Sequence, residues 1–509
     1  MKREIWIPAV LAVALYLPAV PYGFVQDDRA IILSNPAAHN VVTAVRAFDD
    51  PYWPRASGGG LYRPLTIVSF AVDWTVSGGR AWWFHVMNAL WHGLATLLIA
   101  MLLARWLPPL GVAVGGLLFA AHPVHVEAVA NLVSRSELLA ACALFGAVLA
   151  ARRSRWPLAI VLSLAAMFAK EHGVVAGALI FLDDWLEGGP RYPKGFYAIL
   201  GLLTAGYLLI WLNVGSQGAS DVAAPFIGAS VGERLALALP TVLRAAWLLV
   251  WPIDLSADYS PQVIAWHDGI SASAIVGVLV VLAVPLMIVR FRRRAPAIAF
   301  GAGLAALTYL PTSNLVFASG LVLAERTLYE AVLVVAAAVG MGAVALARRR
   351  DARLAGLVAG ILVLAFAARS LVRIPSWRDN RSFLITLLTE HPESYRAHFS
   401  AAAVSAGIGD TAGARHQYEL ADSLFPGDPH LDGNRAFFAL TRGDTTLADS
   451  LARRARAAYP REQMAVRVQV VRTSQQGRVG AAQALADSAI RWHPPEEAWY
   501  RATFSPRNR

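Results

Sequence analysis

The chain has 509 residues, of which 57% are hydrophobic and 16% are charged. Soluble domains carry about 25% charged residues, so this composition argues against a soluble enzyme and also excludes a disordered chain. The net charge of +11 does not indicate nucleic-acid binding, because the basic residues form short runs between apolar stretches. A single cysteine, Cys142, excludes an intramolecular disulfide. These features predict a membrane protein with several spanning helices.

Apolar stretches recur along the first three quarters of the chain, and a spanning helix needs about 20 such residues. The candidate stretches are 5–24, 82–104, 109–121, 137–151, 157–187 (as one or two helices), 196–213, 235–251, 271–289, 296–311, 327–347 and 354–372. They predict an all-α, polytopic transmembrane bundle of about 10–12 spans over residues 1–375. The first stretch follows basic residues as a signal peptide does, but many spans follow it, so we expect it to be retained.

The basic runs predict the orientation of this bundle. Lys2 and Arg3 place the N-terminus in the cytoplasm, and the runs at 152–155, 290–294 and 348–350 should face the same side. Everything after about Ser376 then lies outside the cytoplasm. The basic runs on either side of 155–290 should both face the cytoplasm, so an even number of helices must cross the membrane between them. The sequence offers five candidates there. We expect one of them to be re-entrant or to lie along the membrane surface, and 157–187 is the first candidate.

The remainder of the chain, 376–509, contains a repeat of 34 residues. The repeating positions are Pro392, Pro426, Pro460 and Pro494; Gly409, Gly443 and Gly477; Ala414, Ala448 and Ala482; and Ala421, Ala455 and Ala489. This period, with small residues where paired helices cross, is typical of tetratricopeptide repeats. We expect three repeats at about 395–428, 429–462 and 463–496. Such a solenoid presents a concave surface to a protein partner.

Ionisable residues at membrane depth mark candidate functional sites. Asp27 and Asp28 directly follow the first apolar stretch. Such a pair can supply a general base and a partner that orients it or a metal, although it can also be a solvated loop. Arg63 opens the next apolar stretch, where it can hold a phosphate or anchor the chain at the headgroups.

Two histidine-containing segments follow. His85, Asn88 and His92 share one face of a helix, as a polar site or as hydrogen bonds between helices. A second group, which could ligate a metal, comprises His122, His125 and Glu127. Pro123 interrupts the helix and there is no paired HExxH spacing, so a polar wall that binds phosphate or sugar hydroxyls is favoured. Arg135 would supply the positive charge of this polar wall.

Two further clusters lie between apolar stretches. Lys170 and Glu171 form a neutralised pair or a lipid-phosphate site. Arg326 and Tyr329 belong to the segment 324–329, which also fits an ion pair at the membrane boundary. The predicted topology places this segment, the Asp27 pair and the His122 segment on the same outer side. Neither a Walker-type motif nor a clear GxGxxG is present, so a nucleotide-sugar donor is not expected.

The polar segments resemble, in order, the motif series of one family. They are FVQDD (24–28), YRPLT (62–66), HPVHVEAVA (122–130), SRSELL (134–139), KEHG (170–173) and ERTLY (325–329). The chain resembles the transmembrane and tetratricopeptide-repeat-containing O-mannosyltransferases, which are GT-C glycosyltransferases of the dolichyl-phosphate-mannose–protein mannosyltransferase type. Its arginine-rich tail favours a bacterial member, and the tail is shorter than that of animal members.

The resemblance implies an inverting transferase in the plasma (inner) membrane. It implies a sugar, mannose in the family, moving from a polyprenyl-phosphate carrier to a protein Ser/Thr or another envelope hydroxyl on the outer side. One of Asp27 and Asp28 is then the base, and the repeats present the acceptor. The implied substrate-binding residues are Arg63, His85, Asn88, His92, His122, His125, Glu127, Arg135, Lys170, Glu171, Arg326 and Tyr329. No cofactor follows from the resemblance, with a divalent metal kept as a minor alternative.

Two other functions compete with the transferase. A non-catalytic membrane scaffold that carries a repeat array for envelope assembly explains the tail but leaves the outer-side clusters unexplained. A transporter also places charges in the membrane, but the sequence shows no clear inverted repeat.

Overall fold

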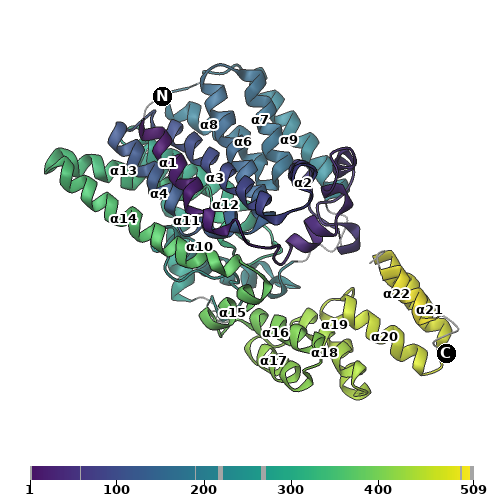
Figure 1. Cartoon of the computed structure of the whole chain (residues 1–509). Coiled ribbons are helices and arrows are strands. Elements are labelled where there is room, and N and C mark those ends of the chain that lie inside the picture. Colours follow the sequence, from purple (N-terminus) through teal and green to yellow (C-terminus); the bar gives the residue numbers. More distant parts are fainter. Residues whose placement is uncertain are drawn as a thin grey trace.

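A computed structural model describes residues 3–57, 59–189, 191–215, 222–264, 271–492 and 496–504. Within these ranges every named element is a helix, and an isolated bridge joins Pro261 and Ile264. A bundle of helices fills the first three quarters of the chain, and shorter helices extend from one end of it (Figure 1). The expected all-α architecture is confirmed.

The bundle helices follow the predicted apolar stretches closely. They are α1 (Arg3–Leu15), α3 (Ala81–Leu103), α4 (Pro109–Ala121), α6 (Arg135–Arg152), α7 (Trp156–Ala169), α8 (Ala176–Leu186), α9 (Lys194–Val214), α10 (Val231–Val250), α11 (Ala272–Phe291), α12 (Pro296–Tyr309), α13 (Val332–Arg349) and α14 (Ala352–Arg373). Helix α1 ends earlier than expected, because Pro18 follows in a 3-10 turn. An additional helix, α2 (Pro64–Ser77), follows Arg63.

Six of these helices are long and apolar enough to cross a membrane, namely α3, α6 with the turn before it, α9, α11, α13 and α14 with the turn after it. Helices α4, α7 and α12, the last with the turn after it, are shorter apolar helices. The protein is therefore a multi-pass membrane protein. Small residues allow close packing: a Cβ on Gly340 of α13 would lie 2.5 Å from the carbonyl oxygen of Gly111 in α4.

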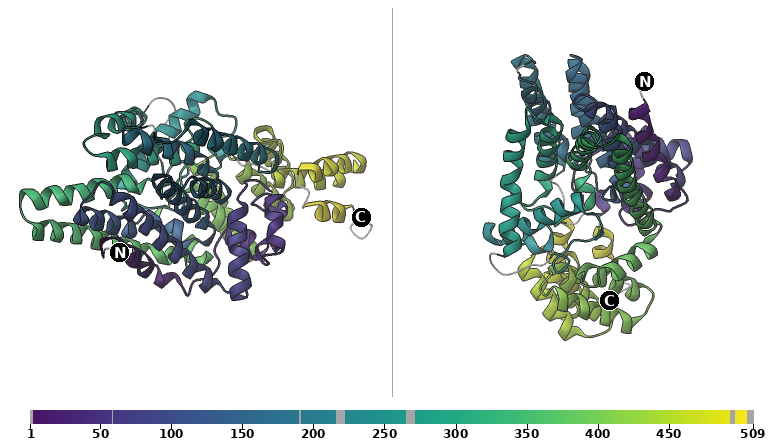
Figure 2. Two further views of the ribbon diagram at one scale, coloured as in Figure 1. Left: turned by 90° about the horizontal axis from the view of Figure 1, so that it is seen from above. Right: turned by 90° about the vertical axis from the view of Figure 1, so that its left-hand side faces the viewer.

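Contacts between helix ends define two sides of the bundle. On one side Arg152 pairs with Asp183, and the Arg292 guanidinium lies 4.4 Å from the ring centre of Trp185. Arg105, at the end of α3, pairs with Glu187 on this same side. The Asp27 loop and the C-terminal helices lie at the other end of the bundle. The right-hand view of Figure 2 shows the C-terminal helices at the opposite end from the N-terminus. We call the end with Asp27 the site side.

Helix α10 lies along the site side and does not cross the bundle. Arg234 in its first turn donates to the carbonyl of Asn314, which follows α12. At its other end the Leu249 carbonyl contacts His122 Nε2 at 3.1 Å, directly after α4. Both partners follow helices that end on the site side.

This placement corrects the expectation for 157–187. That segment forms two short helices, α7 and α8, joined by a turn at Glu171–Val175. Lys170, at the end of α7, lies on the site side beside Glu137, whereas Asp183 in α8 lies on the opposite side beside Arg152. Helix α7 therefore runs to the site side, and α8 runs back to the opposite side. Because α10 stays on the site side, the helices that cross the bundle between residues 155 and 290 are α7, α8, α9 and α11, which is an even number.

The C-terminal segment folds into α15 (Asn380–Glu390) and then consecutive helix pairs. The pairs are α16 (Tyr395–Gly407) with α17 (Thr411–Leu424), α18 (Pro429–Thr441) with α19 (Thr445–Ala458), and α20 (Gln463–Gln475) with α21 (Val479–Trp492), followed by α22 (Glu497–Thr503). The repeating alanines, such as Ala414 and Ala448, are fully buried. Gly409, Gly443 and Gly477 have positive φ in the turns within each pair. This arrangement fits the predicted repeats.

Candidate active site

Asp28 fixes the loop that carries both acidic residues. Its Oδ2 accepts a hydrogen bond from the backbone N–H of Val25 at 2.8 Å, and its Oδ1 accepts one from Val133 at 3.0 Å. The residue is 1% exposed. Burial raises the pKa of Asp28 to about 7, although the two backbone N–H groups act in the opposite direction. Oδ2 thus holds the loop itself together, and Oδ1 ties it to the turn at Leu132–Ser134.

Asp27 is exposed, in contrast to its neighbour. Burial by the surrounding protein nevertheless raises its pKa, against the positive charges of Arg326, Arg396 and Arg63. The adjacent N–H of Gln26 donates to Asn380 Oδ1 of α15 at 2.7 Å, and Gln26 itself has positive φ. Asp27 is therefore an exposed carboxylate with a raised affinity for a proton, which suits a general base.

Arg63 and Glu171 form a two-pronged ion pair across 108 residues of sequence. Arg63 Nε lies 3.0 Å from both carboxylate oxygens, and Nη2 lies 2.8 Å from Oε2. Burial disfavours the charge on Glu171, but Arg63 outweighs this effect and lowers its pKa. The Arg63 guanidinium also lies 4.9 Å from the ring centre of Tyr52. These contacts hold its planar group in one orientation.

Arg326 is held by Glu127 in the same way. Its guanidinium pairs with Glu127 Oε1, and its backbone N–H donates to Oε2 at 2.9 Å. The Arg326 side chain is 31% exposed, whereas Glu127 is buried. The preceding residue, Glu325, accepts hydrogen bonds from Tyr259 at 2.8 Å and from the N–H of Ser256, and burial raises its pKa to about 7.

Lys170 belongs to a buried network with two acidic residues. Its ammonium group pairs with Glu137, and His172 Nε2 lies 3.1 Å from Glu330 Oε1. Burial and the neighbouring charges of Arg63 and Arg326 lower the pKa of Lys170 well below its usual range. The charges of Arg63 and Arg326, which come from distant segments, therefore both act on Lys170 at the site side.

The same network includes a set of residues that could hold a metal ion. Ligand atoms of Glu137, His172 and Glu330 lie within 4.8 Å of one another. The ammonium group of Lys170 already contacts Glu137, so this cluster has a positive partner of its own. The candidate ligands named from the sequence are used elsewhere: Glu127 binds Arg326, and His122 contacts the Leu249 carbonyl.

Arg135 is enclosed within the protein. It is fully buried, and its Nη1 lies 2.5 Å from Asp73 Oδ2. Its Nε donates to Asn88 Oδ1 at 2.7 Å, and Nη2 donates to the Phe84 carbonyl at 3.1 Å. These contacts join α2, α3 and α6. The structure does not bring Arg135 together with the exposed cation at Arg326.

The remaining histidines join helices to one another. His92 Nδ1 lies 2.7 Å from the Tyr329 hydroxyl, and His125 Nε2 lies 3.1 Å from the Tyr329 carbonyl. Asn88 also donates to the Val129 carbonyl at 3.2 Å, and His85 Nε2 lies 3.4 Å from the Gly23 carbonyl. All of these side chains are buried, in agreement with the alternative of hydrogen bonding between helices.

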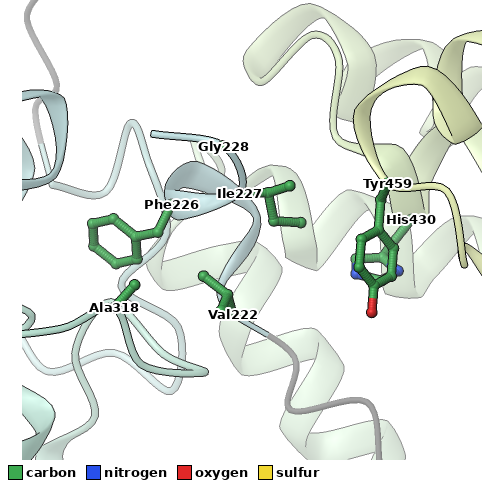
Figure 3. A pocket seen from close by; sticks show the side chains of 7 residues that line it. All are labelled: Val222, Phe226, Ile227, Gly228, Ala318, His430 and Tyr459. Atoms are coloured by element: carbon green, nitrogen blue, oxygen red, sulfur yellow. The ribbon is translucent and has the colours of Figure 1, made fainter. Parts of the chain in front are cut away.

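A cavity of about 220 Å³ lies between the bundle and the repeats. Phe226, Ile227 and Ala318 line it from the bundle loops, and His430 and Tyr459 line it from the repeat helices (Figure 3). None of the predicted site residues is among its lining residues.

Sequence reasoning missed several residues that complete the site. Asp73 neutralises Arg135, and Glu330 contacts His172. Arg373 pairs with Glu390 and lies 3.8 Å from Glu325. Glu330 directly follows Tyr329, and this position beside a predicted site residue is its one sequence signal. The others lie on segments whose contacts depend on the tertiary fold.

Comparison with known proteins identifies relatives over most of the chain. The "Protein O-mannosyl-transferase F38B6.6" of Caenorhabditis elegans is 25% identical over 443 residues, covering 83% of this chain and 63% of that protein. Human "Protein O-mannosyl-transferase TMTC4" is 26% identical over 480 residues, covering 80% and 64%. The chain is therefore similar in sequence to proteins named protein O-mannosyl-transferases.

A shorter region is more similar. "Protein O-mannosyl-transferase Tmtc2" of Drosophila melanogaster is 34% identical over 197 residues, covering 35% of this chain and 21% of that protein. The chain spans just under two thirds of the length of the worm and human relatives.

No family model matches the chain. The solved structure of ArnT from Cupriavidus metallidurans bound to undecaprenyl phosphate is 14% identical, covering 77% of this chain and 80% of that one, with a TM-score of 0.33.

Proposed function

We propose that the protein is a membrane glycosyltransferase of the GT-C type. It transfers a sugar, mannose by analogy with its named relatives, from a polyprenyl-phosphate carrier to a Ser or Thr hydroxyl of a protein. The observation that carries this proposal is a set of ion pairs at the site side, in which Arg63 is held by Glu171, Lys170 by Glu137 and Arg326 by Glu127. The charges of Arg63 and Arg326 also act on the exposed carboxylate of Asp27. A cationic cluster beside a base fits an anionic leaving group and an acceptor that must lose a proton.

The cations stabilise the phosphate as negative charge develops on it. Arg63 and Arg326 are already oriented by Glu171 and Glu127, so little reorganisation is needed when the carrier binds. A bound phosphate also favours the protonated form of Lys170, because it brings an opposite charge to a buried ammonium group. His92, His125 and Tyr329 support the wall of the site through the contacts described above.

Asp27 is the proposed base, and Asp28 is a positioning residue. Asp27 accepts the proton of the hydroxyl as the oxygen attacks C1 of the sugar. The C1–O bond to phosphate breaks at the same time, its electrons remain on the phosphate, and the configuration at C1 inverts. Asp28 cannot serve equally well, since both of its oxygens accept backbone hydrogen bonds. We propose no metal in this step.

The site side faces away from the cytoplasm in this proposal. The basic runs at 152–155 and 290–294 lie at the opposite end, as the positive-inside rule requires. In a bacterium, the repeats at 376–509 then lie outside the plasma membrane, where they present the acceptor. Residues 1–375 form the transferase domain.

The proposal is tested with purified protein and radiolabelled polyprenyl-phosphate mannose, followed by a panel of other polyprenyl-phosphate sugars. We expect release or transfer of the sugar from one of these donors. If no donor is bound or turned over, the protein is a membrane-anchored repeat scaffold and the transferase proposal is wrong. An acceptor peptide rich in Ser and Thr distinguishes transfer from hydrolysis.

A further inference from the structure

The first repeat helix is anchored directly to the membrane bundle at the site side. Ser394, which caps α16, donates from Oγ to Asp258 Oδ2 at 2.7 Å. His391 Nε2 lies 3.3 Å from the Leu255 carbonyl. These contacts fix the start of α16 against the loop that follows α10.

The chain before α16 also contacts the loop of Asp27. The N–H of Gly23 donates to the Arg378 carbonyl at 3.2 Å, and the N–H of Gln26 donates to Asn380 Oδ1 at 2.7 Å. The C-terminal segment therefore contacts the residue that directly precedes Asp27.

Arg396 is the second residue of α16, directly after the contacts that anchor this helix. Its side chain is 58% exposed, and its Nη1 lies 3.7 Å from Asp258 Oδ1, beyond hydrogen-bond distance. Its positive charge acts on Asp27 in the same sense as that of Arg326. By contrast, Arg63 and Arg326 are both tightly paired with carboxylates. Among the hydrogen bonds of the described residues, none is donated by the Arg396 guanidinium.

An exposed guanidinium with donors to spare, next to a base, is suited to an anionic group of a substrate. We propose that Arg396 is a substrate-binding residue, contributed by the first repeat to the membrane site, that holds an anionic group beside Asp27. This inference rests on the proposed transferase function. The anion is either the carrier phosphate or an acidic side chain next to the acceptor hydroxyl. In both cases the repeats take part in the reaction site as well as in acceptor recruitment.

The test compares Arg396→Gln with wild type and with Arg415→Gln, which removes an exposed arginine from the outer helix of the same repeat, α17. Binding of radiolabelled undecaprenyl phosphate is measured at equilibrium. The KM values of two Ser-containing peptides, one flanked by Asp and one by Asn, are measured with the donor found for the wild-type protein. Loss of a charge-assisted hydrogen bond should weaken the affected step by about tenfold or more.

Weaker binding of undecaprenyl phosphate in Arg396→Gln alone assigns Arg396 to the carrier phosphate. A raised KM confined to the Asp-flanked peptide assigns it to the acceptor. Arg396→Lys should recover part of the loss, because it restores the charge but not the planar group. Equal behaviour of Arg396→Gln and Arg415→Gln overturns the inference while leaving the transferase intact. A wild-type protein that neither binds undecaprenyl phosphate nor uses any donor contradicts the proposed function itself.

A second readout does not depend on turnover. Carbodiimide reacts with protonated carboxyl groups, and mass spectrometry locates the label on Asp27. Removing the Arg396 charge should raise the pH at which this labelling disappears, because the pKa of Asp27 rises when a nearby cation is lost. An unchanged midpoint in Arg396→Gln, with unchanged thermal unfolding, contradicts the placement of Arg396 beside Asp27.

Discussion

The guanidinium of Arg63 binds both carboxylate oxygens of Glu171, although 107 residues separate them in the chain. The pair joins the start of α2 to the turn between α7 and α8. It fixes a cation at the proposed phosphate site before the substrate arrives. Such preorganisation is worth more than the charge alone, because the group need not reorient as the phosphate leaves.

The first prediction concerns this pair. Arg63→Lys keeps the charge but loses the planar two-pronged contact, and Glu171→Gln leaves the guanidinium less well oriented. Each should lower kcat/KM for the donor by about tenfold to a hundredfold, equivalent to about 1.4–2.7 kcal/mol. The double variant should be little worse than either single variant, because both remove the same arrangement. Losses that multiply in the double variant would show that the two residues act independently.

The second prediction concerns Asp28 and stability. Its pKa is about 7 in the folded protein but near 4 in an unfolded chain, so the folded state binds more protons between these values. Stability should therefore fall as the pH rises from about 4 to about 7, by at most about 4 kcal/mol from this group. Glu325 contributes in the same direction.

Thermal unfolding in detergent between pH 4 and pH 8 measures this effect. Asp28→Asn should flatten the pH dependence, and it should lower stability at pH 4 because one backbone N–H loses its acceptor. Asp27→Asn is the matched control for the loss of stability at pH 4, since Asp27 is exposed and makes neither of these loop contacts. An unchanged pH slope in Asp28→Asn would mean that the carboxyl group is not protonated on folding.

The third prediction concerns the two sides of the membrane. The native Cys142 is buried, so introduced cysteines can be read without removing it. Arg294→Cys lies in a basic run, and Ser423→Cys lies in the first repeat. A membrane-impermeant thiol reagent should label the first only in inside-out vesicles and the second only in right-side-out vesicles. Labelling of both from the same side would contradict the topology.

Local signals predicted most of the fold. The 34-residue period places each helix pair of the tail, because small residues are needed wherever those helices cross. Apolar stretches likewise mark the bundle helices. Helix α10 was misjudged because its apolar content resembles that of a span, whereas its contacts with Asn314 and His122 show that it stays on one side.

Less of the candidate site than of the fold could be predicted from the sequence. The sequence shows Asp27, Arg63 and Arg326 as charges at apolar boundaries, but it does not show their partners. Arg135 appears as one more cation in the sequence, yet Asp73 and Asn88 bind it entirely inside the bundle. Arg396 lies in a repeat whose periodicity says nothing about what faces Asp27. Such pairings depend on packing between distant segments, and no local pattern encodes them.

The most direct test of the account is the rate of sugar transfer by Asp27→Asn, measured beside wild type at saturating donor in the radiolabelled assay. General-base catalysis contributes about 10²–10⁴-fold, so kcat should fall by that factor while binding of undecaprenyl phosphate and thermal stability stay close to wild type. Wild-type turnover by Asp27→Asn would show that this exposed carboxylate does not activate the acceptor.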